Sequence, residues 1–179
     1  ILASIRREES RPGRGLLKIF FGMAPGVGKT YAMLEAAIQA AGKGVQVMIG
    51  VAESHGREDT MRLIGRLPRL PMKKMAYRGV QMEEFDLEEA LRVKPQLILV
   101  DELAHTNVPG MRHRKRYQDV EDLLAAGIDV YTTLNVQHLE SRSDTVHDIT
   151  AAPVQETVPD SVLAEADCIQ LVDITPERL

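Results

Sequence analysis

Short apolar runs alternate along the chain with longer segments of helical periodicity. The apolar runs predict strands near residues 17–22, 45–51, 97–101, 128–133 and 168–172, with a weaker candidate at 73–77. The segments between them predict helices at 29–41, 57–66, 86–93, 115–126 and 160–166. Strands that alternate with helices are typical of a mainly parallel sheet with helices packed on both faces. We therefore expect a single α/β domain.

The segment between the first strand and the first helix has the composition of a phosphate-binding loop. Its glycines allow backbone N–H groups to approach an anion, and the helix that follows presents unpaired N–H groups and the positive end of its dipole. The lysine adds a mobile positive charge, and the threonine offers a hydroxyl to Mg²⁺. We therefore predict a nucleotide site in a P-loop NTPase-like domain, formed by Ala24, Pro25, Gly26, Val27, Gly28, Lys29 and Thr30.

One position of this loop departs from the usual pattern. The pattern Gly-x-x-x-x-Gly-Lys-Ser/Thr places its first glycine where this chain has Met23, and Gly22 stands one place too early. A side chain at Met23 restricts the backbone where glycine would be free, while Gly26 and Gly28 remain nearest the phosphates. We expect the first turn of the loop to be affected more than its anion-binding half.

A second signal comes from the apolar run 97–100, which leads directly into Asp101 and Glu102. Such a run predicts a buried parallel strand that delivers carboxylates to the carboxyl edge of the sheet. We expect Asp101 to hold Mg²⁺ through water, and Glu102 to orient an attacking water or accept its proton. The alternative is that the two acidic residues only cap the strand.

Polar clusters follow several of the predicted strands, at the edge where parallel α/β sheets bind ligands. They comprise residues 53–57, residues 105–107, and Asn135, Gln137 and His138. We expect the last three to contact the nucleotide and sense its presence. For each cluster the alternative is structural, because such residues also form turns and cap helices. The five histidines have no short spacing typical of metal ligands.

Composition narrows the functional class. The chain has 179 residues, 44% of them hydrophobic and 27% charged, which is ordinary for one globular domain. Its net charge of −4 provides no overall basic field, so we expect no nucleic-acid partner.

No apolar stretch reaches the roughly 18 residues of a membrane-spanning helix, and no secretion signal opens the chain. The single cysteine, Cys168, cannot form an internal disulfide and is expected to pack in the core.

Residues 112–116 form the densest basic run, Arg-His-Arg-Lys-Arg, at the start of a predicted helix. Positive charge at this end opposes the helix dipole, so local helix stability does not explain the run. Three interpretations stay open: a solvated face, an arginine that faces a phosphate, and a docking surface for an acidic protein partner. We expect no nucleic acid here, because the run lacks interleaved aromatic residues.

Five blocks of the sequence, taken in order, closely resemble the N-terminal cytoplasmic domain of the Kdp potassium-transport sensor histidine kinases. The blocks are residues 22–30, 53–57, 101–107, 112–113 and 132–141. The likeness runs from about Gly13 to Leu179. The phosphate loop alone is unspecific, but the blocks around His105 and Asn135 are distinctive in order and spacing.

The resemblance implies a function and a larger context. It implies that residues 16–179, after a flexible tail at 1–15, form an ATP-binding regulatory domain. The parent would be a bacterial inner-membrane sensor kinase, a homodimer that acts on a response regulator under potassium limitation or osmotic stress. Its membrane region and histidine-phosphorylating core would lie beyond Leu179. The remainder of the kinase would be this domain's partner, and ATP and Mg²⁺ its cofactors.

Two alternatives remain at this point. In the first, the domain is a P-loop phosphotransferase that moves the γ-phosphoryl group to a protein hydroxyl, with Glu102 as the base. In the second, it is a docking module with a relict nucleotide loop, and it depends on Arg112–Arg116. In the main interpretation this part of the chain is at most a slow ATPase.

Overall fold

The computed structural model describes residues 13–142 and 156–173. Its strands are β1 (Leu17–Gly22), β2 (Val47–Val51), β3 (Lys73–Tyr77), β4 (Val80–Glu84), β5 (Leu97–Val100), β6 (Asp129–Asn135) and β7 (Cys168–Val172). Its helices are α1 (Lys29–Gly42), α2 (Glu58–Ile64), α3 (Leu87–Val93), α4 (Arg116–Ala125) and α6 (Asp160–Ala164), with a 3₁₀ turn, η1 (Val136–His138). Most of the tail predicted at 1–15, and His147, lie outside the described residues.

Five of the strands form one parallel sheet in the order β2-β5-β6-β1-β7. In this order β6 lies between β1, which precedes the glycine-rich loop, and β5, which precedes Asp101. The register pairs Gly22 at the end of β1 with Asn135 at the end of β6. The segments that follow these strands therefore leave the sheet side by side, and the predicted parallel α/β sheet is confirmed.

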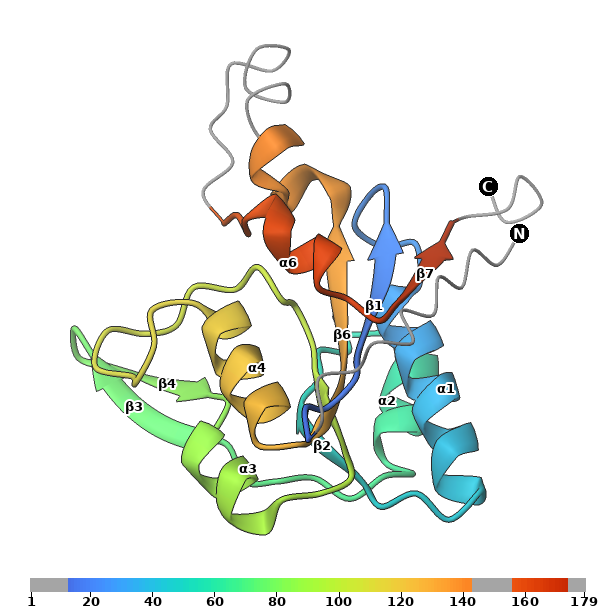
Figure 1. Cartoon of the computed structure of the whole chain (residues 1–179). Coiled ribbons are helices and arrows are strands. Elements are labelled where there is room, and N and C mark those ends of the chain that lie inside the picture. The colour runs from blue at the N-terminus through green and yellow to red at the C-terminus, as the bar shows by residue number, and fades with distance from the viewer. Residues whose placement is uncertain (1–12, 143–155, 174–179) are drawn as a thin grey trace.

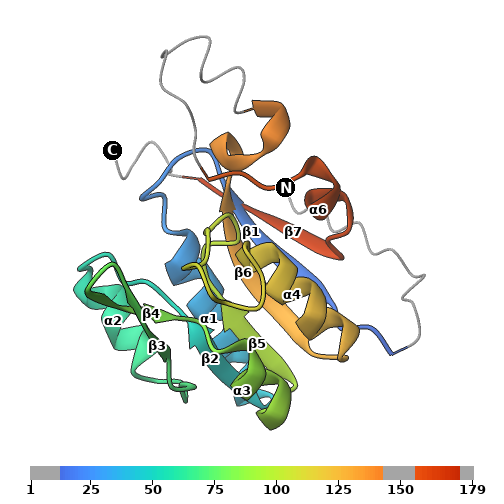
Figure 2. The ribbon, with the colours of Figure 1, turned by 90° about the vertical axis from the view of Figure 1, so that its left-hand side faces the viewer.

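Helices cover both faces of this sheet, as predicted (Figures 1 and 2). On one face α1 and α2 bury a cluster that includes Phe20, Leu34 and Leu99. On the other face α3, α4 and α6 bury a second cluster, which includes Ile98 and Leu123. The strands alternate between the two clusters because successive side chains of a strand point to opposite faces.

The helix boundaries lie within two residues of the predicted ones, because the chain carries clear start signals. Gly28 caps α1 with a left-handed φ of 94°, a conformation that costs glycine little. Asp86 caps α3 by accepting a hydrogen bond from the backbone N–H of Glu89. In the part of the chain that the structure describes, no helix is both long and apolar enough to cross a lipid bilayer.

The structure differs from the sequence prediction at two places. The candidate strand at 73–77 is confirmed, but it pairs with β4, which the sequence did not predict, in a separate antiparallel hairpin. Residues Arg78 and Gly79 turn this hairpin with φ of 49° and 77°.

Cys168 is half-buried on the edge strand β7. The prediction that it packs in the core was therefore wrong, because an edge strand has a neighbour on one side only.

Candidate functional site

The phosphate-type loop joins β1 to α1 at the carboxyl edge of the sheet. Gly26 adopts φ of 81°, in the left-handed region where a side chain would be strained. The ammonium of Lys29 donates a hydrogen bond to the carbonyl oxygen of Ala24 at 3.1 Å, so the lysine folds back over the loop. Burial lowers the pKa of Lys29, and the nearby carboxylates of Asp101 and Glu102 partly oppose that shift. The positively charged ammonium group of Lys29 therefore lies beside the loop.

Asp101 is the point where several segments of the site meet. Its side chain is fully buried at the end of β5. The hydroxyl of Thr30 donates to it at 3.0 Å, and the hydroxyl of Thr133 on β6 donates to it as well. The backbone N–H groups of Glu53 and Glu102 complete the set, at 3.0 and 3.1 Å. The predicted pair of metal-binding residues, Thr30 and Asp101, is thus in direct contact.

This donor set fits a Mg²⁺ ion bound to a nucleotide. The Thr30 hydroxyl lines the pocket, and Asp101 lies behind it. A hydroxyl in contact with the ion and a carboxylate that reaches it through water are the ligands that Mg²⁺ takes in phosphate loops. Asp101 does not itself line the pocket, so it would meet such an ion only through an intervening water.

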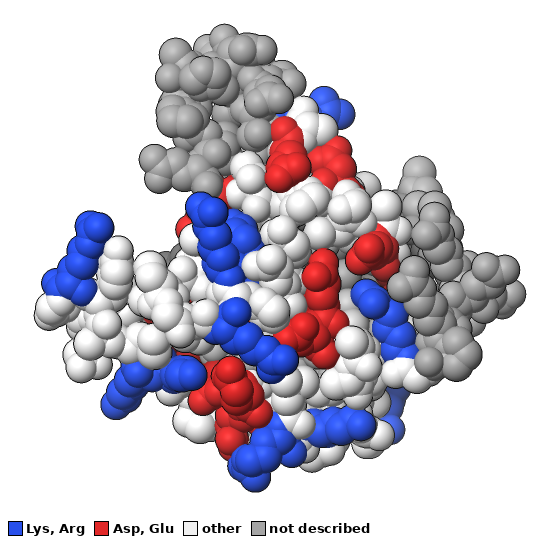
Figure 3. All heavy atoms as spheres, turned by 60° about the vertical axis from the view of Figure 1, so that its left-hand side comes forward, with Lys and Arg blue, Asp and Glu red and all other residues white. Residues whose placement is uncertain are grey.

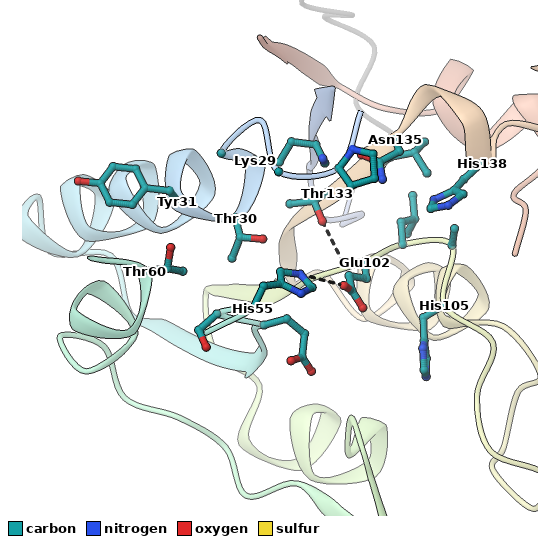
Figure 4. Close-up of a pocket in the computed structure, with 18 of the residues that line it drawn as sticks. Lys29, Thr30, Tyr31, His55, Thr60, Glu102, His105, Thr133, Asn135 and His138 are labelled. Carbon is teal, nitrogen blue, oxygen red and sulfur yellow. Dashed lines mark hydrogen bonds and ion pairs between the residues drawn. The ribbon is translucent and has the colours of Figure 1, made fainter. Parts of the chain in front are cut away.

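Glu102 follows Asp101 and faces the pocket beside His55 (Figure 4). The Nε2 atom of His55 lies 3.3 Å from Oε1 of Glu102. Both residues have left-handed backbones, with φ of 51° for His55 and 58° for Glu102. Such conformations are uncommon outside glycine and gather at functional sites. Burial, followed by the charge of Asp101, raises the pKa of Glu102, a change that strengthens a carboxylate as a base.

A pocket of about 520 Å³ opens along this edge of the sheet, a volume within the range of small-molecule sites. Figure 4 shows Lys29, Thr30 and Glu102 around it, with Asn135 and His138 at the end nearer β6. Burial lowers the pKa of His138, which favours its neutral form. The predicted site residues that line the pocket are Pro25, Gly26, Gly28, Lys29, Thr30, Glu102, Asn135, Gln137 and His138. Ala24, Val27 and Asp101 do not line it.

Several residues of the pocket carried no individual prediction. Thr133 ends a predicted strand, but its contact with Asp101 depends on the pairing of β6 with β5, which the sequence did not predict. Tyr31 and Thr60 line the pocket from α1 and α2, but one such residue per helix gives no sequence pattern. Glu156 reaches the pocket from a segment with no predicted strand or helix.

The segment that follows Glu102 is held by buried polar contacts with the hairpin. Glu84, at the end of β4, accepts hydrogen bonds from the Nε2 atom of His105 at 3.0 Å and the backbone N–H of Val108 at 3.0 Å. It also lies 3.5 Å from the guanidinium of Arg116, which donates to the carbonyl oxygen of Asp101 at 2.9 Å. Burial alone would raise the pKa of Glu84, but His105, Val108 and Arg116 leave it below its ordinary value.

Asn107 has a structural role in the same segment. Its side chain donates to Asp119 of α4 and to the carbonyl oxygen of His113, each at 3.0 Å. Burial raises the pKa of Asp119 to about 6, although the hydrogen bond from Asn107 opposes the shift. The structural alternative considered for Asn107 therefore holds, whereas His105 also lines the pocket.

The basic run at residues 112–116 is not a continuous exposed surface. Arg116 is buried against Glu84, and the Lys115 ammonium donates to the carbonyl oxygen of Ala104. Arg112 and His113 both contact Asp122, at 3.5 and 2.7 Å. On the face shown in Figure 3, basic and acidic side chains of the described residues are interspersed. Any acidic partner at this run would meet the exposed Arg112 and Arg114, because Arg116 is out of reach.

Comparison with known proteins places these features in a family. Residues 13–179 match the family described as the osmosensitive K⁺ channel His kinase sensor domain, KdpD. The chain is 54% identical over its full length to the sensor protein KdpD of Clostridium acetobutylicum, and 53% identical over 172 residues to that of Escherichia coli K12. A putative sensor protein KdpD of Synechocystis is 54% identical over 166 residues.

The matches cover 100%, 96% and 93% of this chain, in that order, but a small part of two of these relatives. The chain spans 20% of the Clostridium protein, 19% of the Escherichia protein and 45% of the Synechocystis protein. The resemblance stated from the sequence blocks is confirmed. The chain belongs to the KdpD family of osmosensitive K⁺ channel histidine kinase sensor domains.

Proposed function

We propose that this domain binds ATP with Mg²⁺ in the pocket between the β1–α1 loop and Glu102. The contact between Thr30 and Asp101 carries the proposal, because it joins the phosphate loop to the acidic strand in the arrangement that a metal-bound triphosphate requires. The loop N–H groups and Lys29 would hold the phosphates. Bound Mg²⁺ would neutralise charge on the β- and γ-phosphates.

Glu102 gives the pocket a group that can move a proton. Its carboxylate faces the cavity, is held near His55, and has a raised pKa. We propose that it orients water for slow hydrolysis of ATP. A protein hydroxyl at the same position would be activated by the same carboxylate, so the phosphotransferase alternative uses the same residue. Incubation with labelled ATP separates the two by where the label appears, in free phosphate or on a protein.

The domain would serve as a regulatory part of a longer sensor histidine kinase. Its relatives are named sensor proteins, and the chain spans about a fifth of the first two. The segment 105–116 adjoins Glu102 and contacts the hairpin through Glu84. We propose that nucleotide binding at the pocket alters this segment and that the remainder of the kinase responds.

Calorimetric titration of the domain with Mg²⁺ and ATP tests the nucleotide site. The wild-type domain should show saturable binding. The Lys29→Ala variant should bind ATP more weakly by about 1.5–3 kcal/mol, or roughly 10- to 150-fold, because one charged hydrogen bond to phosphate is lost.

Lys43→Ala is the matched control for this variant. Lys43 is an exposed lysine at the other end of α1, so its removal changes the net charge equally and should leave ATP affinity unchanged. Absence of saturable binding by the wild-type domain would contradict the proposed function and favour the docking module. Equal affinities of wild type and Lys29→Ala would contradict the proposed site, because ATP would then bind elsewhere.

A further inference from the structure

The turn between β2 and α2 contacts both the acidic pair Asp101 and Glu102 and the glycine-rich loop. At its start, the backbone N–H of Glu53 donates to Asp101, and in its middle His55 contacts Glu102. At its end, the guanidinium of Arg57 donates to the carbonyl oxygen of Gly26 in the phosphate loop, at 3.0 Å. Arg57 thus reaches the glycine-rich loop from a different strand connection and lines the pocket.

The loop sequence is adapted to this approach. A Cβ atom at Gly26 would lie 3.2 Å from the Nη2 atom of Arg57, a tight contact, and Gly26 also has φ of 81°. A residue with a side chain would be strained there and would crowd the guanidinium. The anchored turn and the glycine together hold Arg57 beside the loop.

Arg57 carries a positive charge that no ion pair among the described residues neutralises. Within residues 13–142 and 156–173 neither Arg57 nor Lys29 forms an ion pair. Both line the same pocket, and after burial the positive charge of Arg57 helps to lower the pKa of Lys29. The carboxylates of Asp101 and Glu102 offset part of this repulsion, and a phosphate group between the two cations would stabilise them further. A guanidinium can also donate two parallel hydrogen bonds to one phosphate group.

We infer that Arg57 is a phosphate-binding residue that distinguishes a triphosphate from a diphosphate. The inference rests on the proposed nucleotide site. In a phosphate loop the backbone amides hold the α- and β-phosphates, while the lysine reaches the β- and γ-phosphates. Arg57 comes from the turn that also carries His55, on the side of Glu102, where the terminal phosphate would lie. On binding, its guanidinium exchanges the Gly26 carbonyl for oxygens of that phosphate.

The test compares affinities for a non-hydrolysable ATP analogue and for ADP, each with Mg²⁺, by calorimetry. Arg57→Ala should weaken binding of the ATP analogue roughly 10-fold or more, since a charged hydrogen bond to the terminal phosphate is lost. Its affinity for ADP should change by less than about threefold. Arg57→Lys should recover part of the lost affinity for the ATP analogue. It restores the positive charge but cannot donate two parallel hydrogen bonds from a planar group. Arg62→Ala, an exposed arginine of α2, should leave both affinities unchanged.

The controls separate failure of this inference from failure of the nucleotide site. Circular dichroism should show that each variant is folded. If wild type binds the ATP analogue but Arg57→Ala loses affinity for both nucleotides equally, or for neither, Arg57 only braces the loop and the inference is overturned. If the wild-type domain binds neither nucleotide, the nucleotide site itself fails. Lys29→Ala should weaken both nucleotides, which distinguishes its role from that of Arg57.

Discussion

At the scale of single residues, the first turn of the glycine-rich loop depends on Gly22 more than on Met23. The side chain of Met23 is 64% exposed, and its φ is not positive. A Cβ atom at Gly22, in contrast, would lie 2.7 Å from the side chain of Val27 and 2.9 Å from that of Lys29. The sequence pattern indicated a weakness at position 23, but the space is restricted one position earlier.

Two substitutions test this difference. Gly22→Ala should lower ATP affinity roughly 10-fold, because the new methyl group displaces the Lys29 side chain and weakens its charged hydrogen bond to phosphate. Met23→Ala should change the affinity less than about twofold, because it removes only exposed atoms. Titration of both variants with Mg²⁺ and ATP would measure the effects, and a larger loss for Met23→Ala would reverse the assignment.

The residues of the site were predictable where they follow a local pattern. Lys29, Thr30 and Asp101 were predicted because each belongs to a pattern of a few consecutive residues. The first two end a glycine-rich turn, and Asp101 follows an apolar run. Arg57 was placed only in a polar cluster. Its contact with Gly26 depends on how two separate strand connections approach each other, and no spacing along the chain encodes that approach.

At the scale of elements, the strands and helices of the main sheet were predictable because each has a buried side. The strand β4 was missed because Val80 to Glu83 are exposed, so the alternation that marks a half-buried strand is absent. Only its last residue, Glu84, enters the interior, where it contacts His105 and Arg116. One buried carboxylate therefore attaches the hairpin to the segment beside the pocket.

The Glu84→Ala substitution tests this attachment. It should lower the free energy of unfolding by about 3–5 kcal/mol, because it leaves the buried guanidinium of Arg116 without its carboxylate. Its exposed neighbour Glu83 is the control, and Glu83→Ala should lie within about 0.5 kcal/mol of wild type. Urea denaturation followed by circular dichroism gives both values. Similar stabilities for the two variants would show that the buried pair does not secure the hairpin.

At the scale of the whole molecule, the two apolar cores are joined through the sheet, and the site lies along one edge of it. The strand β1 contributes Phe20 to one core and Ile19 to the other. The loop after β1, the turn after β2, Glu102 after β5 and Asn135 at the end of β6 all meet at the pocket. A ligand there contacts connections from most of the sheet, so its binding should stabilise the domain as a unit.

Thermal unfolding measures this linkage. ATP with Mg²⁺ at 100 times its dissociation constant should stabilise the domain by about 2.7 kcal/mol, which for a chain of this size raises Tm by roughly 5–10 °C. At the same ATP concentration the shift in Lys29→Ala should be much smaller. Equal shifts in the two proteins would indicate that ATP acts outside the pocket.

The position of β1 between β6 and β7 has a consequence for biosynthesis. Translation proceeds from the N-terminus, so β1 is synthesised long before the two strands that flank it. These strands, β6 and β7, begin at Asp129 and Cys168. Until those strands emerge, the glycine-rich loop has its complete sequence but lacks the pairing that fixes its ends. A nascent chain that stops upstream of Asp129 also lacks Thr133, one of the two hydroxyls on Asp101. The proposed nucleotide site would therefore be complete only when translation of the domain is nearly finished.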